Sequence, residues 1–233
     1  MKIIAANFKM NLTKTEIDNY LNTIKGKIDK NVIFFPSDIY LNDFSSYLTG
    51  SQNISFIEKG AVTGDTSIIQ LLDMNIKYTL IGHSERRLYF NDNNYINSKI
   101  RLALLNKITP ILCIGENLEE YQKKVTFKKL TKQIDEAFLT NNSILNDSLI
   151  VAYEPIWSIG TGNILDNKTI VEVIDFIKKY ILNNYKLNLK VIYGGSVNLN
   201  NISNLESLDL DGYLIGNACL DPNKFLELIS FIK

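Results

Sequence analysis

A carboxylate followed by a bounded loop is the most suggestive chemical feature of the sequence. Glu154 directly follows the apolar run Leu149–Tyr153, and the next segment begins with Pro155 and contains two glycines, one of them Gly160. A carboxylate at the end of a buried strand can reach a substrate, and a loop bounded by Pro and Gly can move as a unit. The sequence therefore predicts a base at Glu154 beneath a lid formed by residues 155–162.

Two further strand ends carry groups that could assist such a base. Asn7 and Lys9 are two residues apart, so an extended chain directs both to one side. His83, the only histidine, follows Gly82 and precedes a short expected helix. A helix N-terminus lowers the basicity of an imidazole, and a neutral ring can donate an N–H to a carbonyl. We expect catalytic roles for Lys9 and His83; the alternatives are a solvated lysine and a structural histidine.

Two glycine-bearing turns follow the last two apolar runs. They contain Gly194, Gly195, Ser196, Gly216 and Asn217. Glycines let backbone N–H groups approach an anion closely, and helix N-termini add favourable partial charge. In barrels, the loops after strands seven and eight commonly bind phosphate. Together with the glycines of segment 155–162, these turns predict a phosphate site.

Eight short apolar runs alternate with helical patterns along the chain. They span Ile3–Phe8, Val32–Phe35, Ile54–Ile57, Tyr78–Ile81, Ile108–Ile114, Leu149–Tyr153, Lys190–Tyr193 and Gly212–Ile215. Runs of this kind are typical of buried parallel strands joined by crossover helices. No linker divides residues 1–233, so we expect one (β/α)₈ barrel domain; the alternative is a doubly wound open sheet.

Helical spacing is expected in the segments between these runs. The segments are Thr13–Lys27, Asp38–Leu48, Asn93–Asn106, Tyr121–Leu139, Asp166–Leu182, Asn200–Leu205 and Pro222–Phe231, with a weaker pattern at Ser67–Met74. Thr13 and Glu16 have the spacing of a capping box, which marks a helix start.

Composition and charge argue against several functional classes. Lys+Arg and Asp+Glu each number 25, and this balance argues against a general role on nucleic acids or membrane surfaces. No apolar run approaches the roughly 20 residues of a membrane span. With one histidine and only Cys113 and Cys219 as thiols, we expect no metal site, no cofactor and a reducing, cytoplasmic setting.

Seven blocks, in order from residue 7 toward the C-terminus, resemble the triosephosphate isomerase family. They are Asn7–Asn11, Gly60–Gly64, Ile81–Arg87, Cys113–Glu116, Ala152–Trp157, Ile159–Gly162 and Tyr193–Val197. The resemblance implies a (β/α)₈ barrel that interconverts dihydroxyacetone phosphate and glyceraldehyde 3-phosphate.

The resemblance also implies a role for each matching residue. Glu154 would take a carbon-bound proton, neutral His83 would polarise the carbonyl, and Lys9 would stabilise developing negative charge. Asn7 would position Lys9 or the substrate, and Glu85 would support Lys9. The phosphate contacts implied or predicted are Gly160, Gly194, Gly195, Ser196, Gly216 and Asn217.

The sequence departs from the family pattern at several positions. Asn217 stands where a second glycine is usual, and asparagine is the side chain that best tolerates positive φ. Phe8 replaces a usual tryptophan, Val62 an aromatic residue, and Asp65 and Asp92 replace glutamates. Loop 60–66 is, by resemblance, the segment that inserts into a neighbouring subunit, so we expect a homodimer.

Two other functions remain open from the residues alone. A barrel lyase or aldolase acting on a sugar phosphate would need a Schiff-base lysine or metal ligands, and Lys9 is the only candidate lysine. A phosphate-ligand sensor without catalysis would keep the glycine turns and lose the base or the electrophile. Glu154, His83 and Lys9 together favour the isomerase.

Overall fold

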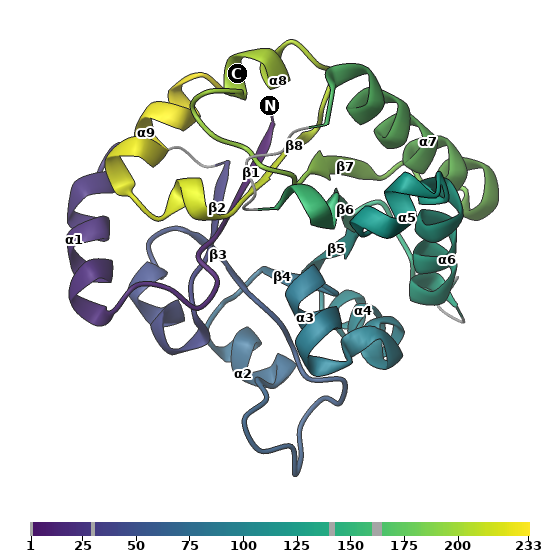
Figure 1. The fold of residues 1–233 in the computed structure, drawn as a ribbon. Helices are drawn as coiled ribbons and strands as arrows, with labels where there is room; N and C mark the ends of the chain where they lie inside the picture. Colours follow the sequence, from purple (N-terminus) through teal and green to yellow (C-terminus); the bar gives the residue numbers. More distant parts are fainter. Residues whose placement is uncertain (1, 29–30, 140–142, 160–164) are drawn as a thin grey trace.

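In the computed structural model, eight parallel strands close into a barrel surrounded by helices (Figure 1). The structure describes residues 2–28, 31–139, 143–159 and 165–233. The strands pair in chain order, and β8 returns to pair with β1. They are β1 Ile3–Asn7, β2 Val32–Phe35, β3 Leu48–Ser51, β4 Tyr78–Ile81, β5 Thr109–Ile114, β6 Ile150–Tyr153, β7 Lys190–Tyr193 and β8 Gly212–Ile215. The expected barrel is confirmed, and the open-sheet alternative is wrong.

The helices pack around the outside of this barrel (Figure 1). They are α1 Lys14–Ile24, α2 Ile68–Asp73, α3 Ser84–Phe90, α4 Ile96–Leu105, α5 Leu118–Gln122, α6 Thr126–Phe138, α7 Asn167–Tyr185, α8 Ile202–Glu206 and α9 Pro222–Ser230. Short 3₁₀ helices lie at Asp38–Phe44 (η1), Asp92–Tyr95 (η2), Ile156–Ser158 (η3) and Asn217–Cys219 (η4). The capping box before α1 is confirmed, because the Glu16 carboxylate accepts the Thr13 backbone N–H at 2.7 Å. In the part of the chain that the structure describes, no helix is long and apolar enough to cross a membrane.

The third strand lies in a different place from the one expected. The run Ile54–Ile57 belongs to the loop after β3, and the strand itself is the less apolar segment Leu48–Ser51. Its polar side chains are buried because they find hydrogen-bond partners inside the fold. The Thr49 hydroxyl donates to the Phe44 carbonyl at 2.9 Å, and the Ser51 hydroxyl donates to the Thr79 hydroxyl at 2.9 Å. Apolarity alone therefore selects the wrong segment.

The long helix expected at Tyr121–Leu139 is in fact two helices. Lys124, between α5 and α6, has a φ of 57°. A left-handed residue cannot continue a right-handed helix, so the chain turns at this point. The helix expected at Asp38–Leu48 is also shorter, because η1 ends at Phe44 and Leu48 already belongs to β3.

Alternation along the strands fixes which residues face the barrel interior. The interior contains Ala5, Ile33, Phe35, Leu80, Ile111, Cys113, Ile150, Ala152, Ile192 and Leu214. A step of two residues keeps a side chain on the same face of a strand. Beyond the last apolar layer, the next inward positions are therefore Asn7 on β1, Glu154 after β6, Gly194 after β7 and Gly216 after β8. The same alternation that directs apolar side chains into the barrel interior therefore directs polar side chains inward at the carboxyl ends of the strands.

Candidate active site

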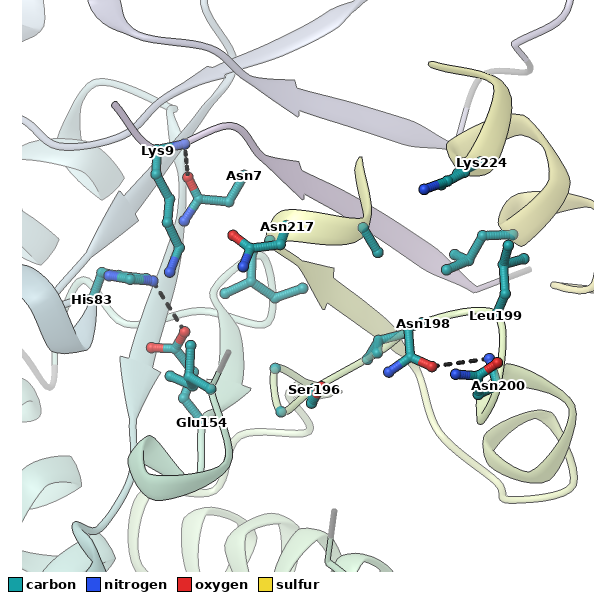
Figure 2. Close-up of a pocket in the computed structure, with 18 of the residues that line it drawn as sticks. Asn7, Lys9, His83, Glu154, Ser196, Asn198, Leu199, Asn200, Asn217 and Lys224 are labelled. Carbon is teal, nitrogen blue, oxygen red and sulfur yellow. Dashed lines mark hydrogen bonds and ion pairs between the residues drawn. The ribbon is translucent and has the colours of Figure 1, made fainter. Parts of the chain in front are cut away.

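The carboxyl ends of the strands open into a cavity of about 740 Å³. Asn7, Lys9, His83 and Glu154 line one side of it (Figure 2). Gly194, Gly195, Ser196, Gly216, Asn217 and Glu85 also line the cavity. Gly160 and the rest of the predicted lid beyond Ile159 lie outside the described residues.

Glu154 is a buried carboxylate held at the end of β6. Its backbone N–H donates to the Ile114 carbonyl at 2.8 Å, and its residue is 3% exposed. Its Oε1 lies 3.2 Å from Nε2 of His83 (Figure 2). Burial raises the pKa of Glu154, but His83 and the nearby Lys9 lower it more, so the pKa lies below its usual value. The group is therefore ionised near neutral pH, as a general base must be.

Two glycines make the space that Glu154 occupies. A Cβ on Gly115 would lie 1.7 Å from the Glu154 carbonyl oxygen, and one on Gly194 would lie 2.8 Å from its Cγ. The Gly194 N–H donates to the Tyr153 carbonyl at 2.8 Å, so this group is engaged in the barrel and is not a spare donor for phosphate. Gly194 thus contributes room for the carboxylate, which sequence reasoning did not foresee. Gly115 was also missed, although it directly follows β5 within one of the matching blocks.

His83 is the N-cap of α3, and its two ring nitrogens face different partners. The Glu85 backbone N–H donates to Nδ1 at 3.3 Å, whereas Nε2 faces Glu154. A ring that accepts at Nδ1 carries its proton on Nε2 when it is neutral. The Nε2–H group therefore points at the carboxylate, into the cavity.

The pKa of His83 departs from the expectation of a lowered value. Burial lowers it, but the carboxylates of Glu154 and Glu85 raise it by more, so the pKa lies above 6.5. The N-terminus of α3 would lower the pKa of His83, but the buried carboxylate of Glu154, 3.2 Å from Nε2, has the larger and opposite effect. The charge of Glu154 consequently controls the protonation of His83.

Lys9 has an unusual backbone that several neighbours hold in place. Its φ is 52°, a left-handed value that costs a non-glycine residue conformational energy. Its N–H donates to Oδ1 of Asn7 at 3.0 Å, and its carbonyl accepts from Gln52 at 2.7 Å and Ser37 at 3.0 Å. Its ammonium group lies 2.7 Å from the Glu85 carboxylate. Asn7 thus positions Lys9, and the lysine side chain is mostly shielded from solvent.

Arg87 anchors strand ends and is not a solvated surface charge. Its guanidinium donates to the Gly82 carbonyl at 2.6 Å, the Cys113 carbonyl at 2.8 Å and the Asn93 side chain at 2.7 Å. These bonds join the ends of β4 and β5 below the site. The neighbouring Arg86 lies instead over the Phe90 ring, with 4.2 Å between its Cζ and the ring centroid.

The base of the predicted lid is packed in this structure. The indole N–H of Trp157 and the hydroxyl of Tyr153 both donate to Oε1 of Glu116, at 3.2 and 3.1 Å. The Tyr121 ring lies against Trp157, with 4.6 Å between the centroids. Trp157 is thus in contact with the barrel. Sequence reasoning gave no role to Glu116 or Tyr121.

The shortened side chain of Asp92 is accommodated by a lysine. Lys99 Nζ lies 2.5 Å from the Asp92 carboxylate, and both residues are 2% exposed. Lys99 also donates to Asn53 at 2.8 Å, which links the pair to the loop after β3. Asp92 is therefore engaged in a direct, buried ion pair.

The turn after β8, where the sequence predicts phosphate binding, does not need the second glycine that is usual in the family. Gly216 has a φ of −96°, and Asn217, the first residue of η4, is not among the residues with positive φ. The tolerance of asparagine for positive φ is therefore irrelevant here, contrary to the sequence-based explanation. In the described part of the chain, no group accepts a hydrogen bond from the backbone N–H of Asn217 or Ser196.

Comparison with known proteins agrees with this geometry. The sequence model of the family "Triosephosphate isomerase" matches residues 2–232. The chain belongs to the triosephosphate isomerase family. A triosephosphate isomerase from Ureaplasma parvum serovar 3 is 40% identical over 242 residues, covering 100% of both chains. Those of Mesomycoplasma hyorhinis and Alkaliphilus oremlandii are 37% and 36% identical, covering 99% and 98% of this chain and 98% of each relative.

Membership of the triosephosphate isomerase family makes the chain an isomerase of triose phosphates. The lyase and sensor alternatives are set aside on this finding. Among the residues that the structure describes, no group of three or more His, Cys, Asp or Glu side chains could hold a metal ion.

Proposed function

We propose that the chain interconverts dihydroxyacetone phosphate and D-glyceraldehyde 3-phosphate by proton transfer through an enediolate. The observation that carries the proposal is the pairing of an ionised, buried Glu154 with the Nε2 side of His83 at 3.2 Å, in the cavity that Lys9 also lines. A carbon acid next to a carbonyl needs a carboxylate base and donors at the oxygen, and this cavity offers both.

The reaction balances without an added oxidant or reductant. Glu154 removes a proton from C1 of the ketone, and the bonding electrons form the C1–C2 double bond as negative charge moves to the C2 oxygen. The Nε2–H of His83 and the Lys9 ammonium stabilise that oxygen. The hydroxyl proton then passes from the C1 oxygen to the C2 oxygen through His83. Glu154 returns a proton to C2, which completes the aldehyde.

In this proposal, the phosphate group binds at the turns after β7 and β8, whose residues Gly195, Ser196, Gly216 and Asn217 line the cavity. Their backbone N–H groups would donate to the phosphate, and Gly160 would add a donor from the lid. Residues 155–162 would close over the substrate and exclude water, which protects the enediolate from side reactions. Burial of the reacting groups also strengthens each electrostatic contact.

A direct assay of the purified chain tests this function. Coupled dehydrogenase assays of both directions of the interconversion report turnover, and binding of glycerol 3-phosphate reports the phosphate site independently. The proposal expects turnover and binding. Binding without turnover would support the sensor alternative and contradict the isomerase.

The single histidine allows the charge coupling in the site to be measured. In the native chain we expect the pKa of His83 to lie above 6.5, because the Glu154 carboxylate raises it. In Glu154→Gln the largest raising influence is gone, while burial and Lys9, which lower the pKa, and Glu85, which raises it, remain, so the pKa should fall relative to the native chain. Imidazole NMR titration of both proteins checks this, with the surface variant Glu119→Gln as a control that leaves the value unchanged. An unchanged or higher pKa in Glu154→Gln would contradict the coupling.

We also propose that the chain is a homodimer through loop 60–66. The segment between β3 and α2 projects from the barrel (Figure 1), and large apolar side chains are exposed on nearby elements. Met10 is 94% exposed, Tyr89 72% and Leu88 70%. Exposed apolar side chains that form a contiguous patch commonly mark a protein interface.

A charge on this surface tests the dimer. Sedimentation velocity of the native chain should give twice the 26.5 kDa chain mass. Tyr89→Glu should shift the protein toward monomer, because a carboxylate in an apolar interface loses its hydration. Leu182→Glu, on α7 and 49% exposed, is the matched control and should stay dimeric. A monomeric native chain would contradict the proposal.

We further propose that residues 1–233 act as one catalytic domain in the cytoplasm, in glycolysis and gluconeogenesis. Cys113 and Cys219 are both buried free thiols, which suits a reducing compartment.

A further inference from the structure

We propose that the side-chain amide of Asn217 binds the phosphate group of the substrate, in addition to the backbone donors of the turn. This inference rests on the proposed function and identifies a specificity-determining side chain for it. A glycine at this position could offer only its backbone N–H. Asparagine adds two N–H donors and one acceptor at the same place.

Asn217 lies where a substrate anion would meet Lys9. A Cβ built on the preceding residue, Gly216, would lie 3.5 Å from Cε and 4.0 Å from Nζ of Lys9. Asn217 and Lys9 line the same cavity. Figure 2 shows the Asn217 amide on the side of the cavity nearest Lys9 and Asn7, away from Asn198 and Lys224.

The Asn217 amide is available, whereas three other asparagine side chains in or next to the cavity are engaged in hydrogen bonds. Oδ1 of Asn7 accepts the backbone N–H of Lys9, and Oδ1 of Asn198 accepts that of Asn200 at 2.9 Å. Nδ2 of Asn201 donates to the Ser196 carbonyl. These amides hold the loops in shape. Asn217 is exposed to the cavity, and no hydrogen bond joins its side chain to any described residue.

The charge of the site makes a neutral donor useful here. Lys9 is the cation that lines the catalytic end of the cavity, but its ammonium is already paired with Glu85 at 2.7 Å. A phosphate dianion shares that ammonium with a carboxylate. The Asn217 amide, in contrast, has no carboxylate partner among the described residues. Both of its N–H groups can therefore donate to the phosphate dianion. Because Asn217 needs no positive φ, the side chain can be removed without straining the turn.

The test compares Asn217→Ala with Asn200→Ala, which removes an exposed amide from the far arm of the same cavity. Calorimetry with glycerol 3-phosphate and with inorganic phosphate measures anion binding without turnover. Rates with glyceraldehyde 3-phosphate and with unphosphorylated D-glyceraldehyde separate phosphate recognition from chemistry. Because a hydrogen bond to a charged group is lost, Asn217→Ala should weaken glycerol 3-phosphate binding about tenfold.

The same variant should lose about tenfold in kcat/KM toward the phosphorylated substrate and nothing toward D-glyceraldehyde. Asn217→Gly should match Asn217→Ala, and Asn200→Ala should match the native chain. Unchanged or tighter anion binding in Asn217→Ala would overturn the inference, and so would an equal loss with both substrates. If the native chain binds glycerol 3-phosphate but turns over neither substrate, the proposed function fails while the binding comparison still decides the role of Asn217.

Discussion

Glu154→Gln is expected to lower kcat by about 10²–10⁴-fold, the usual contribution of a general base. The amide has nearly the same shape as the carboxylate and can still accept from Nε2 of His83. It cannot take a proton from carbon. Binding of glycerol 3-phosphate, which has no carbonyl, should change little, so the loss should appear in kcat and not in ligand affinity.

The control for this variant is Glu119→Gln, a carboxylate on α5 whose side chain is 72% exposed. It makes the same chemical change far from the cavity and should retain the native rate. Circular dichroism and thermal melting of both variants establish that the fold is intact. A kcat for Glu154→Gln within a few-fold of the native value would contradict the role of Glu154 as base.

Gly115→Ala is expected to be the most disruptive small substitution near the site. The new Cβ would lie 1.7 Å from the carbonyl oxygen of Glu154 and 2.6 Å from its carbonyl carbon. These are backbone atoms, so no rotamer change relieves the overlap, and the ends of β5 and β6 must separate. We expect a loss of about 3 kcal/mol in unfolding free energy, at the upper end of overpacking effects. Displacing the base by about 1 Å should also cost roughly 10²-fold in kcat.

Gly26→Ala is the matched control for Gly115→Ala. It adds the same methyl group at a residue with a φ of 72°, where no atom lies within 4 Å of the new Cβ. Its cost should be limited to backbone strain of roughly 1–2 kcal/mol, with an unchanged kcat. Denaturant unfolding and steady-state kinetics compare the two. Equal effects of both substitutions, or a native kcat for Gly115→Ala, would contradict the proposed packing around Glu154.

The sequence predicted the barrel and the inward direction of its polar groups because both follow from local periodicity. Asn7 lies two residues beyond Ala5, and Glu154 two beyond Ala152, so strand parity alone carries them into the cavity. The position of β3 was not predicted from this periodicity, because its buried side chains are polar. Their hydrogen-bond partners, such as Thr79 for Ser51, come from distant segments that no local pattern reveals.

The parts of the site that sequence reasoning missed depend on contacts between strands. The room that Gly115 makes for Glu154 exists only once β5 and β6 lie side by side. The raised pKa of His83 likewise arises from a carboxylate 71 positions away along the chain, which outweighs the effect of the helix N-terminus. A residue can be identified from sequence as a candidate acid or base, but its protonation is set by the packed neighbours.

Isomerisation in ²H₂O, followed by ¹H NMR, tests the central claim of a carbon proton transferred by Glu154 most directly. Starting from dihydroxyacetone phosphate, we expect glyceraldehyde 3-phosphate that carries deuterium at C2, because the proton on the Glu154 carboxyl can exchange with solvent before it returns to carbon. The Glu154→Gln variant should form this deuterated product at least about 10²-fold more slowly. Deuterium appearing at C2 at the native rate in Glu154→Gln would contradict the transfer of this proton by Glu154.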